Sequence, residues 1–405
     1  MTLNATPSSE RIQIAFFGRR NSGKSTLVNA VTGQEMSLVS EVKGTTTDPV
    51  RKAMELLPLG PVVIIDTPGI DDEGELGDLR VRRASRVLEQ ADIAVLVTDA
   101  PAAGDEPDYP APDRELIRLF REKNIPYLIA WTKSDLRTES GNASDGSTVS
   151  VSALTGSGME MLKEKLAGLA EEKSGTGRKL VSDLIEPGDM VLLVIPVDES
   201  APKARLILPQ QQVIRDILDA GGCFAGCQPD QLAETLRKLK EKPTLVITDS
   251  QAFSEVARIL PPEIPMTSFS ILFARYKGDL EILTKGAEVM KALGDGDRVL
   301  VSEGCTHHRQ CNDIGTVKLP GWIRELCGRE PVFDFTSGGS FPEDLSPYRL
   351  IVHCGGCMLH EKEMRRRMEA AARKGVPMVN YGAAIACAGG VLDRSLEPLK
   401  KDGKT

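Results

Sequence analysis

Short apolar runs alternate with amphipathic stretches along the first 170 residues of the chain. Each run is followed by turn residues and by a segment with helical periodicity. This alternation is typical of a doubly wound α/β sheet, in which buried parallel strands are continuous apolar runs. The pattern predicts strands at residues 13–17, 62–66, 93–98, 127–131 and 148–153. It also predicts a closing amphipathic helix at 158–171, with Met159, Leu162, Leu166 and Leu169 on one face.

Two further series of strands and helices follow a polar, glycine-containing stretch at residues 171–178. The first has predicted strands at 190–197 and 244–248 and helices at 211–220 and 229–241. The second follows the proline-rich segment 260–265, with predicted strands at 298–302, 349–353 and 376–381. We therefore expect an α/β chain with a mostly parallel sheet followed by two smaller α/β domains, divided into residues 1–172, 180–265 and 266–405.

A phosphate-binding pattern, GxxxxGK[ST], directly follows the first predicted strand, at residues 18–25. Glycines in such a loop let backbone N–H groups surround the α- and β-phosphates at a helix N-terminus. Lys24 is expected to reach the β- and γ-phosphates, and the Ser25 hydroxyl to bind Mg2+. The residues expected to bind nucleotide here are Gly18, Asn21, Ser22, Gly23, Lys24, Ser25 and Thr26.

Two later segments predict where the γ-phosphate and its magnesium ion bind. The sequence DTPG, residues 66–69, ends the second predicted strand. Asp66 is expected to hold Mg2+ through water, and Gly69 to donate its N–H to the γ-phosphate. Between the two motifs, the segment GTTTD at 44–48 is expected to supply a hydroxyl to Mg2+ from Thr46 or Thr47. The sequence leaves the choice between these two threonines open.

The segment Thr132-Lys133-Ser134-Asp135 favours guanine as the base. A carboxylate at Asp135 can accept from both the N1–H and the N2 amine of guanine, and a site built for such a pair strongly rejects a base that lacks it. Lys133 is expected to lie across the base. Ser152 and Ala153, in the sequence SAL, are expected to offer a backbone N–H to guanine O6. We therefore expect a protein that binds and hydrolyses GTP.

These motifs, in this order, resemble those of the TrmE–Era-type GTPases over about residues 11–170. Thr132 stands where asparagine is commoner. Ile70 stands where some GTPases have the glutamine that orients water, so slow intrinsic hydrolysis is expected. In TrmE-like relatives the asparagine matching Asn21 helps to bind K+, so the resemblance implies K+-stimulated hydrolysis, with Asn21, Lys24 and Gly69 as the catalytic groups. The alternative is that Asn21 only stabilises the loop.

Cysteine and histidine are concentrated near the end of the chain. Six of the eight cysteines and all four histidines follow residue 300, and in a reducing compartment such clustering favours metal binding over disulfides. The segments 305–307 (CTH) and 353–357 (HCGGC) each follow a predicted parallel strand, where open α/β sheets build their sites. Three thiolates with a loosely defined fourth position favour an iron–sulfur cluster. Zinc, and buried thiols without metal, are the alternatives.

The CxH and HCxxC segments, about 45 residues apart on the same chain as a TrmE-like GTPase, resemble the HydF family of FeFe-hydrogenase maturation GTPases. The resemblance covers essentially the whole chain. It implies GTPase, dimerisation and cluster-binding domains, with a 4Fe–4S cluster on Cys305, Cys354 and Cys357 and with His307 or His353 as a candidate fourth ligand. It also implies a homodimer or higher homo-oligomer that receives a di-iron precursor from radical-SAM maturases and delivers it to apo FeFe-hydrogenase.

The net charge of −8 disfavours a nucleic-acid partner. The longest apolar run has about eight residues, whereas a membrane helix needs about 20, and the first residues lack the apolar core of a signal peptide. We therefore expect a cytoplasmic protein without a membrane partner. The competing class is an RNA- or ribosome-associated GTPase with a zinc-binding appendage, which the first 170 residues do not distinguish. A third class is a redox enzyme with a fully thiolate-ligated cluster.

The remaining cysteines and one basic stretch are weaker candidates. Cys223, Cys227, Cys311 and Cys327 are expected to be packing or incidental thiols, and Cys387 to be buried near the site without binding metal. The basic stretch follows CGGC and is either a solvated helix face or a docking surface for the acceptor protein or an anionic precursor. Its members are Lys362, Arg365, Arg366, Arg367, Arg373 and Lys374.

Overall fold

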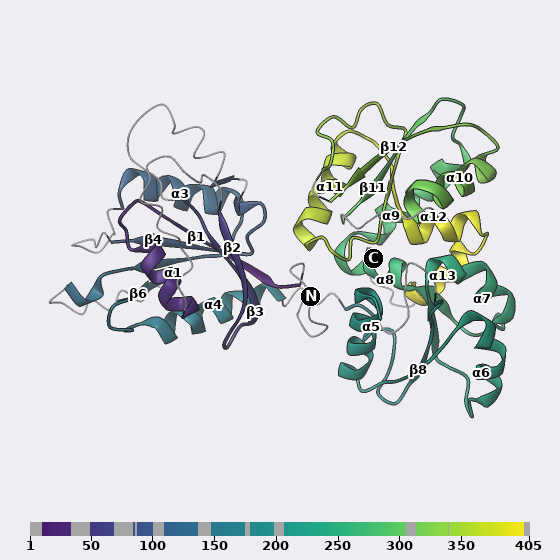
Figure 1. Cartoon of the computed structure of the whole chain (residues 1–405), viewed down its shortest axis with the longest axis horizontal. Helices are drawn as coiled ribbons and strands as arrows, with labels where there is room; N and C mark the ends of the chain where they lie inside the picture. The colour runs from purple at the N-terminus through teal and green to yellow at the C-terminus, as the bar shows by residue number, and fades with distance from the viewer. Residues whose placement is uncertain are drawn as a thin grey trace. The chain divides into compact units, whose positions relative to one another are not determined.

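The computed structural model describes ten ranges of the chain, namely residues 10–33, 49–68, 84–85, 87–99, 109–136, 147–174, 179–197, 206–304, 313–338 and 340–400. The chain divides into two compact units, Met1–Gly177 and Arg178–Thr405 (Figure 1). The first contains a six-stranded sheet and the second contains two four-stranded sheets. The α/β class predicted from the sequence is confirmed.

The first unit has the strand order β2-β3-β1-β4-β5-β6. All neighbouring strands are parallel except β2 and β3, which pair antiparallel. Strand β2 is an edge strand that the apolar pattern did not predict, because charged residues interrupt its apolar ones and most of its residues are exposed. The strands are β1 (Ile12–Gly18), β2 (Val50–Leu56), β3 (Gly60–Asp66), β4 (Ile93–Thr98), β5 (Tyr127–Trp131) and β6 (Thr148–Ser150).

Helices cover both faces of this sheet. Successive residues of β1 point to opposite faces, as the pleat requires: Phe16 packs with α1 (Lys24–Thr32) and α4 (Met159–Ser174), while Phe17 packs with Phe120 of α3 (Ala111–Glu122). Figure 1 shows α3 on the face opposite α1 and α4. A short 3-10 helix, η1 (Ser134–Leu136), follows β5. Both faces of β1 are therefore buried, which explains the apolar run at residues 14–17.

The second unit begins with a parallel sheet in the order β10-β9-β7-β8. The edge strand β8 was not predicted, because its sequence CFAGC is short and mostly exposed. The strands are β7 (Met190–Val194), β8 (Cys223–Cys227), β9 (Leu245–Thr248) and β10 (Met266–Ser268). The helices are α5 (Leu208–Asp219), η2 (Pro229–Gln231), α6 (Leu232–Lys238), η3 (Ser250–Ala252), α7 (Phe253–Ile259) and α8 (Phe269–Lys277).

The last sheet is also parallel, in the order β12-β11-β13-β14. Its strands are β11 (Arg298–Glu303), β12 (Val332–Ser337), β13 (Leu350–His353) and β14 (Met378–Asn380). Its helices are α9 (Leu280–Lys291), the π-helical turn η4 (Ile314–Lys318), α10 (Leu319–Cys327), α11 (Glu361–Arg373), α12 (Tyr381–Ala388), α13 (Leu392–Leu396) and η5 (Glu397–Leu399).

The two sheets of the second unit share packing elements. Ala386 of α12 packs with Leu192 of β7 and Ile271 of α8 in one apolar core. Strand β10, which follows residue 265, pairs with β9 of the preceding sheet. The division at residues 265 and 266, like the other predicted boundaries, stays a prediction. Within the described parts of the chain, no helix has the length and apolar character needed to cross a membrane.

Candidate functional site

The phosphate-binding loop connects β1 to α1. Gly18 ends β1, and a Cβ atom at this position would lie 2.5 Å from the carbonyl oxygen of Val97, so the close strand approach requires glycine. Asn21 and Gly23 have left-handed backbone angles, with φ of 63° and 85°. Gly23 caps α1, whose first turn carries the predicted Lys24, Ser25 and Thr26. The chain therefore makes a tight turn directly before a helix N-terminus, as anion-binding loops do.

The two charged groups predicted to bind phosphate and magnesium lie together. Lys24 Nζ and the carboxylate of Asp66, at the end of β3, form a buried ion pair. Ser22 is 1% exposed, and no partner of its hydroxyl occurs among the described residues. The fold thus collects these side chains at the carboxyl edge of the sheet. Gly69, Ile70, Thr46 and Thr47 lie outside the described residues.

Thr132 ties the loop to the sheet. Its Oγ1 donates to the carbonyl oxygen of Ser22 at 2.6 Å and lies 3.3 Å from that of Thr98. The side chain is buried and would lie 3.3 Å from a Cβ atom at Gly23. The threonine therefore anchors the phosphate-binding loop even though it stands in place of the commoner asparagine.

The predicted base-binding residues border the same loop. Lys133 has a left-handed φ of 58°, and its Nζ donates to the carbonyl oxygen of Asn21 at 3.1 Å. Asp135, in η1, accepts a hydrogen bond from Ser152 Oγ at 2.6 Å. Ser152 and Ala153 follow β6 after one intervening residue, Val151. The two segments predicted to contact guanine are therefore joined to each other through their side chains.

The sequence pattern missed a charged network beside this loop. Arg19 Nη2 donates to Asp99 Oδ1 at 2.8 Å, and its Nε lies 3.5 Å from Asp113 Oδ2. Lys133 pairs with the other Asp99 oxygen at 3.0 Å. Burial raises the pKa of Asp113. Burial also acts to raise the pKa of Asp99, but the Lys133 hydrogen bond and the charges of Lys133 and Arg19 bring it below its usual value. The position of Asp99 directly after β4 was the available signal.

The cysteine loop, defined here as residues 354–359, leaves the end of β13. The Sγ atom of Cys354 accepts backbone N–H groups from Gly304 at 3.0 Å and from Gly356 at 3.4 Å. Gly356 has a left-handed φ of 65°, which turns the backbone around the sulfur. Burial raises the pKa of the Cys354 thiol to about 11, although these N–H groups act to lower it.

The ends of β11 and β13 meet as expected, since Ser302 and His353 are paired in register. Gly304 directly precedes Cys305 in the sequence, but Cys305, His307 and Cys311 lie outside the described residues. Cys357 is partly buried in the same loop as Cys354. In the part of the chain that the structure describes, no group of three or more Cys, His, Asp or Glu side chains is arranged to hold a metal ion.

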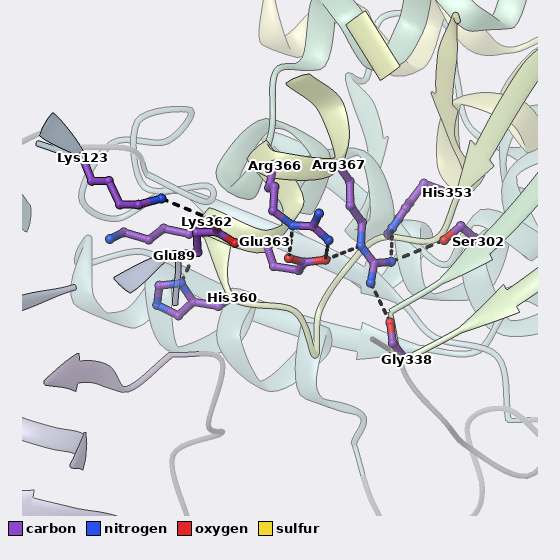
Figure 2. A network of polar contacts seen from close by, with 10 residues as sticks. All are labelled: Glu89, Lys123, Ser302, Gly338, His353, His360, Lys362, Glu363, Arg366 and Arg367. Atoms are coloured by element: carbon purple, nitrogen blue, oxygen red, sulfur yellow. Dashed lines mark hydrogen bonds and ion pairs between the residues drawn. The ribbon is translucent and has the colours of Figure 1, made fainter. Parts of the chain in front are cut away.

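His353 is fully buried and both of its ring nitrogens have partners. Nδ1 lies 2.8 Å from the carbonyl oxygen of Cys354, and Nε2 lies 3.1 Å from Arg367 Nη1 (Figure 2). Burial lowers the pKa of the ring to about 4, so it is neutral: Nδ1–H donates and Nε2 accepts. To act as the fourth ligand, His353 would have to give up one of these hydrogen bonds.

Most of the basic stretch is paired along α11. Arg365 pairs with Glu361, Arg366 with Glu363 and Arg373 with Glu369, all on the exposed face. Arg367 differs, because it is fully buried. Cys223 and Cys227 lie on β8 and Cys327 ends α10; Cys387 is buried, and its Sγ donates to the carbonyl oxygen of Ala287.

Three family models match successive parts of the chain. Residues 13–133 match the 50S ribosome-binding GTPase model. Residues 180–278 match the hydrogen maturase F dimerization domain, and residues 281–398 match the hydrogen maturase F tetramerization domain. The two maturase F models together cover more than half of the chain.

Similar proteins match about two fifths of the chain. The tRNA modification GTPase MnmE of Hamiltonella defensa subsp. Acyrthosiphon pisum is 34% identical over 161 residues, 39% of this chain and 35% of the relative. MnmE of Methylobacterium radiotolerans is 35% identical over 175 residues, 43% of this chain and 36% of the relative. The crystal structure of a probable GTP-binding protein engB is 26% identical and covers 40% of this chain and 99% of that chain, with a TM-score of 0.31. The chain thus spans about a third of the length of these curated relatives.

Proposed function

Because this chain belongs to the HydF family of hydrogenase-maturation GTPases, we propose that it is a scaffold that carries a 4Fe–4S cluster, holds a di-iron precursor and transfers it to apo FeFe-hydrogenase. The GTPase domain binds GTP with Mg2+ and hydrolyses it. The dimerisation and tetramerisation domains support a homo-oligomer. Radical-SAM maturases would supply the precursor, which is the cargo of the scaffold.

For the nucleotide site, we assign Lys24 to the β- and γ-phosphates and Ser25 and Asp66 to Mg2+. The buried pairing of Lys24 with Asp66 supports this assignment, because it puts a cation for phosphate and a carboxylate for magnesium at one sheet edge. Asp135 would read guanine, beside Ser152. Gly69 and a hydroxyl from Thr46 or Thr47 complete the proposed site. K+ bound near Asn21 would assist hydrolysis.

For the cluster we assign Cys305, Cys354 and Cys357 as ligands. The observation that carries this assignment is the approach of the Gly304 N–H to Cys354 Sγ at 3.0 Å, because it puts the residue before Cys305 against the second proposed ligand. Two N–H groups aimed at one sulfur suit a thiolate, which is an acceptor only. The donor set therefore fits a sulfur-bound iron centre. When bound, a 4Fe–4S cluster supplies an iron position to which the cargo can attach.

The test is EPR of the reduced full chain after anaerobic reconstitution with iron and sulfide, together with metal analysis of the purified protein. A 4Fe–4S signal that is lost in C305S, C354S and C357S, and kept in the exposed-thiol control C223S, supports the scaffold. About one zinc per chain and no cluster would overturn it. An RNA-associated GTPase with a zinc-binding appendage would then be the leading function.

GTP hydrolysis would act as a switch for exchange of partners. The test follows transfer of the precursor to apo FeFe-hydrogenase by a loaded Lys24→Ala variant, in which the phosphate-binding ammonium is absent. Transfer should no longer respond to GTP. Transfer that keeps the wild-type rate and the wild-type response to GTP would remove the switch from the proposal.

A further inference from the structure

Two buried cations lie at the two ends of the cysteine loop. Arg367 of α11 is 0% exposed, and Lys277, the last residue of α8, is 2% exposed. Moving a charged side chain out of water is costly unless its hydrogen bonds are met inside the protein. For both cations, hydrogen bonds to the cysteine loop or to the ends of neighbouring strands offset much of this cost.

Arg367 joins the carboxyl ends of three strands (Figure 2). Its Nη1 donates to Ser302 Oγ of β11 at 3.3 Å and to His353 Nε2 of β13 at 3.1 Å. Its Nη2 donates at 2.6 Å to the carbonyl oxygen of Gly338, directly after β12. Nε donates to Glu363 Oε1 at 2.8 Å, and the guanidinium lies 5.0 Å from the centre of the Phe341 ring.

The contact continues from Arg367 into the loop. His353 accepts from Arg367 at one nitrogen and, at the other, donates to the carbonyl oxygen of Cys354. His353 is therefore a rigid link between the guanidinium and the first cysteine of the loop. A lysine could keep the charge but not the forked set of hydrogen bonds.

Lys277 holds the second half of the loop. Its Nζ donates to the carbonyl oxygen of Cys357 at 3.0 Å and to that of Leu359 at 3.1 Å. The ammonium also lies 5.7 Å from the centre of the Phe273 ring. Lys277 belongs to the segment that matches the dimerisation domain, so a residue of that segment fixes the backbone of the second cysteine.

We propose that Arg367 and Lys277 are positioning residues for the iron–sulfur centre, which fix both ends of the cysteine loop and set a positive potential there. The inference rests on the proposed function. Charges inside a protein are screened less than in water, so a fixed cation stabilises nearby thiolates and the added electron of a reduced cluster. Residues that orient ligands typically change metal affinity by about 10- to 100-fold.

The test compares matched pairs of variants of the full chain, each reconstituted anaerobically with iron and sulfide. R367M is paired with R366M, because both arginines pair with Glu363 but Arg366 is exposed and Arg367 is buried. K277M is paired with K285M, an exposed lysine of α9 whose partner is Glu281. The measurements are the reduction potential by EPR-monitored titration and the rate of iron loss to a chelator.

R367M and K277M should have more negative potentials than their controls and lose iron about tenfold faster. E363Q should have the opposite effect on the potential, because it removes a negative charge and leaves Arg367 in place. A purely structural role would change iron retention and stability but leave the potential of the loaded fraction unchanged, and that result would overturn the inference.

Failure of the proposed function would look different. If the wild-type chain takes up no cluster, the scaffold and this inference both fall. If it does take up a cluster and the buried-cation variants match their controls, only this inference falls. If the methionine variants do not fold, R367K and K277R replace them, because they keep the positive charge. Their reduction potential should stay near that of the wild type while iron loss accelerates. A clearly lower reduction potential would contradict the proposed role.

Discussion

One hydroxyl connects the phosphate-binding loop to β5. Thr132 donates to the carbonyl oxygen of Ser22 from a buried position, so the role of the commoner asparagine passes to a shorter side chain. Both the position of Thr132 and its departure from the family pattern could be predicted from the sequence. Whether a threonine is long enough to reach the loop depends on how closely the end of β5 packs against it. A sequence pattern carries no information about that distance.

Removing this hydroxyl should weaken the loop. T132V keeps the shape of the side chain but leaves the carbonyl of Ser22 without this donor, a loss of about 1–3 kcal/mol. We expect lower stability and weaker binding of fluorescent GTP analogues in titrations. T32V is the control, because the Thr32 hydroxyl donates to the carbonyl oxygens of Val28 and Asn29 in its own helix. Equal nucleotide affinity in the two variants would show that Thr132 is not a tether.

Asn21 offers a second test in the same loop. If K+ assists hydrolysis there, the rate in K+ should exceed the rate in Na+ at equal ionic strength by about tenfold or more, since a cation supplied as an arginine finger is worth about 10³–10⁵ in kcat. N21A should lose the difference between the two ions while keeping its hydrolysis in Na+. Steady-state phosphate release measures both, and equal rates of the wild-type protein in the two salts would contradict K+ stimulation.

Helix α11 illustrates what a sequence pattern does and does not reveal. Its run of arginines predicted a basic face, and Arg365, Arg366 and Arg373 do lie on an exposed, ion-paired face. Arg367 has the same residue type but is buried among strand ends that come from distant parts of the sequence. The strands β1, β3, β4 and β5 could be predicted because burial on both faces makes them apolar. The edge strands β2, β8 and β12 could not, since one side of each is exposed.

The Glu363–Arg367 pair should make stability depend on pH. Burial acts to raise the pKa of Glu363, but the hydrogen bonds and charges of Arg366 and Arg367 bring it below its usual value. A carboxyl with a lowered folded-state pKa stabilises the fold above its unfolded-state pKa of about 4.3, and this contribution is lost as the pH falls through the folded-state value.

Urea unfolding of E363Q and of the wild type measures the contribution of the Glu363 carboxylate to stability. The two are compared at pH 7 and at about pH 3.5–4, where carboxyl groups titrate. The loss should be on the order of 3 kcal/mol at pH 7, because Arg367 is left buried without its carboxylate, and smaller in acid. E361Q is the control in the same helix, where the exposed pair with Arg365 is worth about 0.3–0.5 kcal/mol. A loss that is the same at both pH values would contradict the ion-pair account.

Each of the two compact units has its own apolar cores. Among the described residues, the cores of the GTPase unit are formed by residues up to 170 and those of the second unit by residues from 180 onward. The proposed chemistry divides in the same way, since the described residues that we propose to bind nucleotide lie in the first unit and the cysteine loop lies in the second. Loading of the cysteine loop should therefore not depend on an intact phosphate-binding lysine.

Lys24→Ala tests this independence. The variant should lose GTP hydrolysis, because the phosphates lose their ammonium partner, while its iron and sulfide content after reconstitution stays equal to that of the wild type. Phosphate release and metal analysis on the same preparation give both values. An iron content that falls with hydrolysis would show that nucleotide binding and cluster loading are coupled.

The hydrogen bond from the Gly304 N–H to Cys354 Sγ joins positions 50 residues apart, and the strands that precede them become neighbours only when β13 has paired with β11. Arg367, which bonds to the ends of both strands, is synthesised later still. A ribosome must therefore synthesise the chain through α11 before the cysteine loop can take its final form. On the proposed function, iron delivered before that point would meet separate thiols instead of a finished site, so incorporation of the proposed cluster should follow the synthesis of α11.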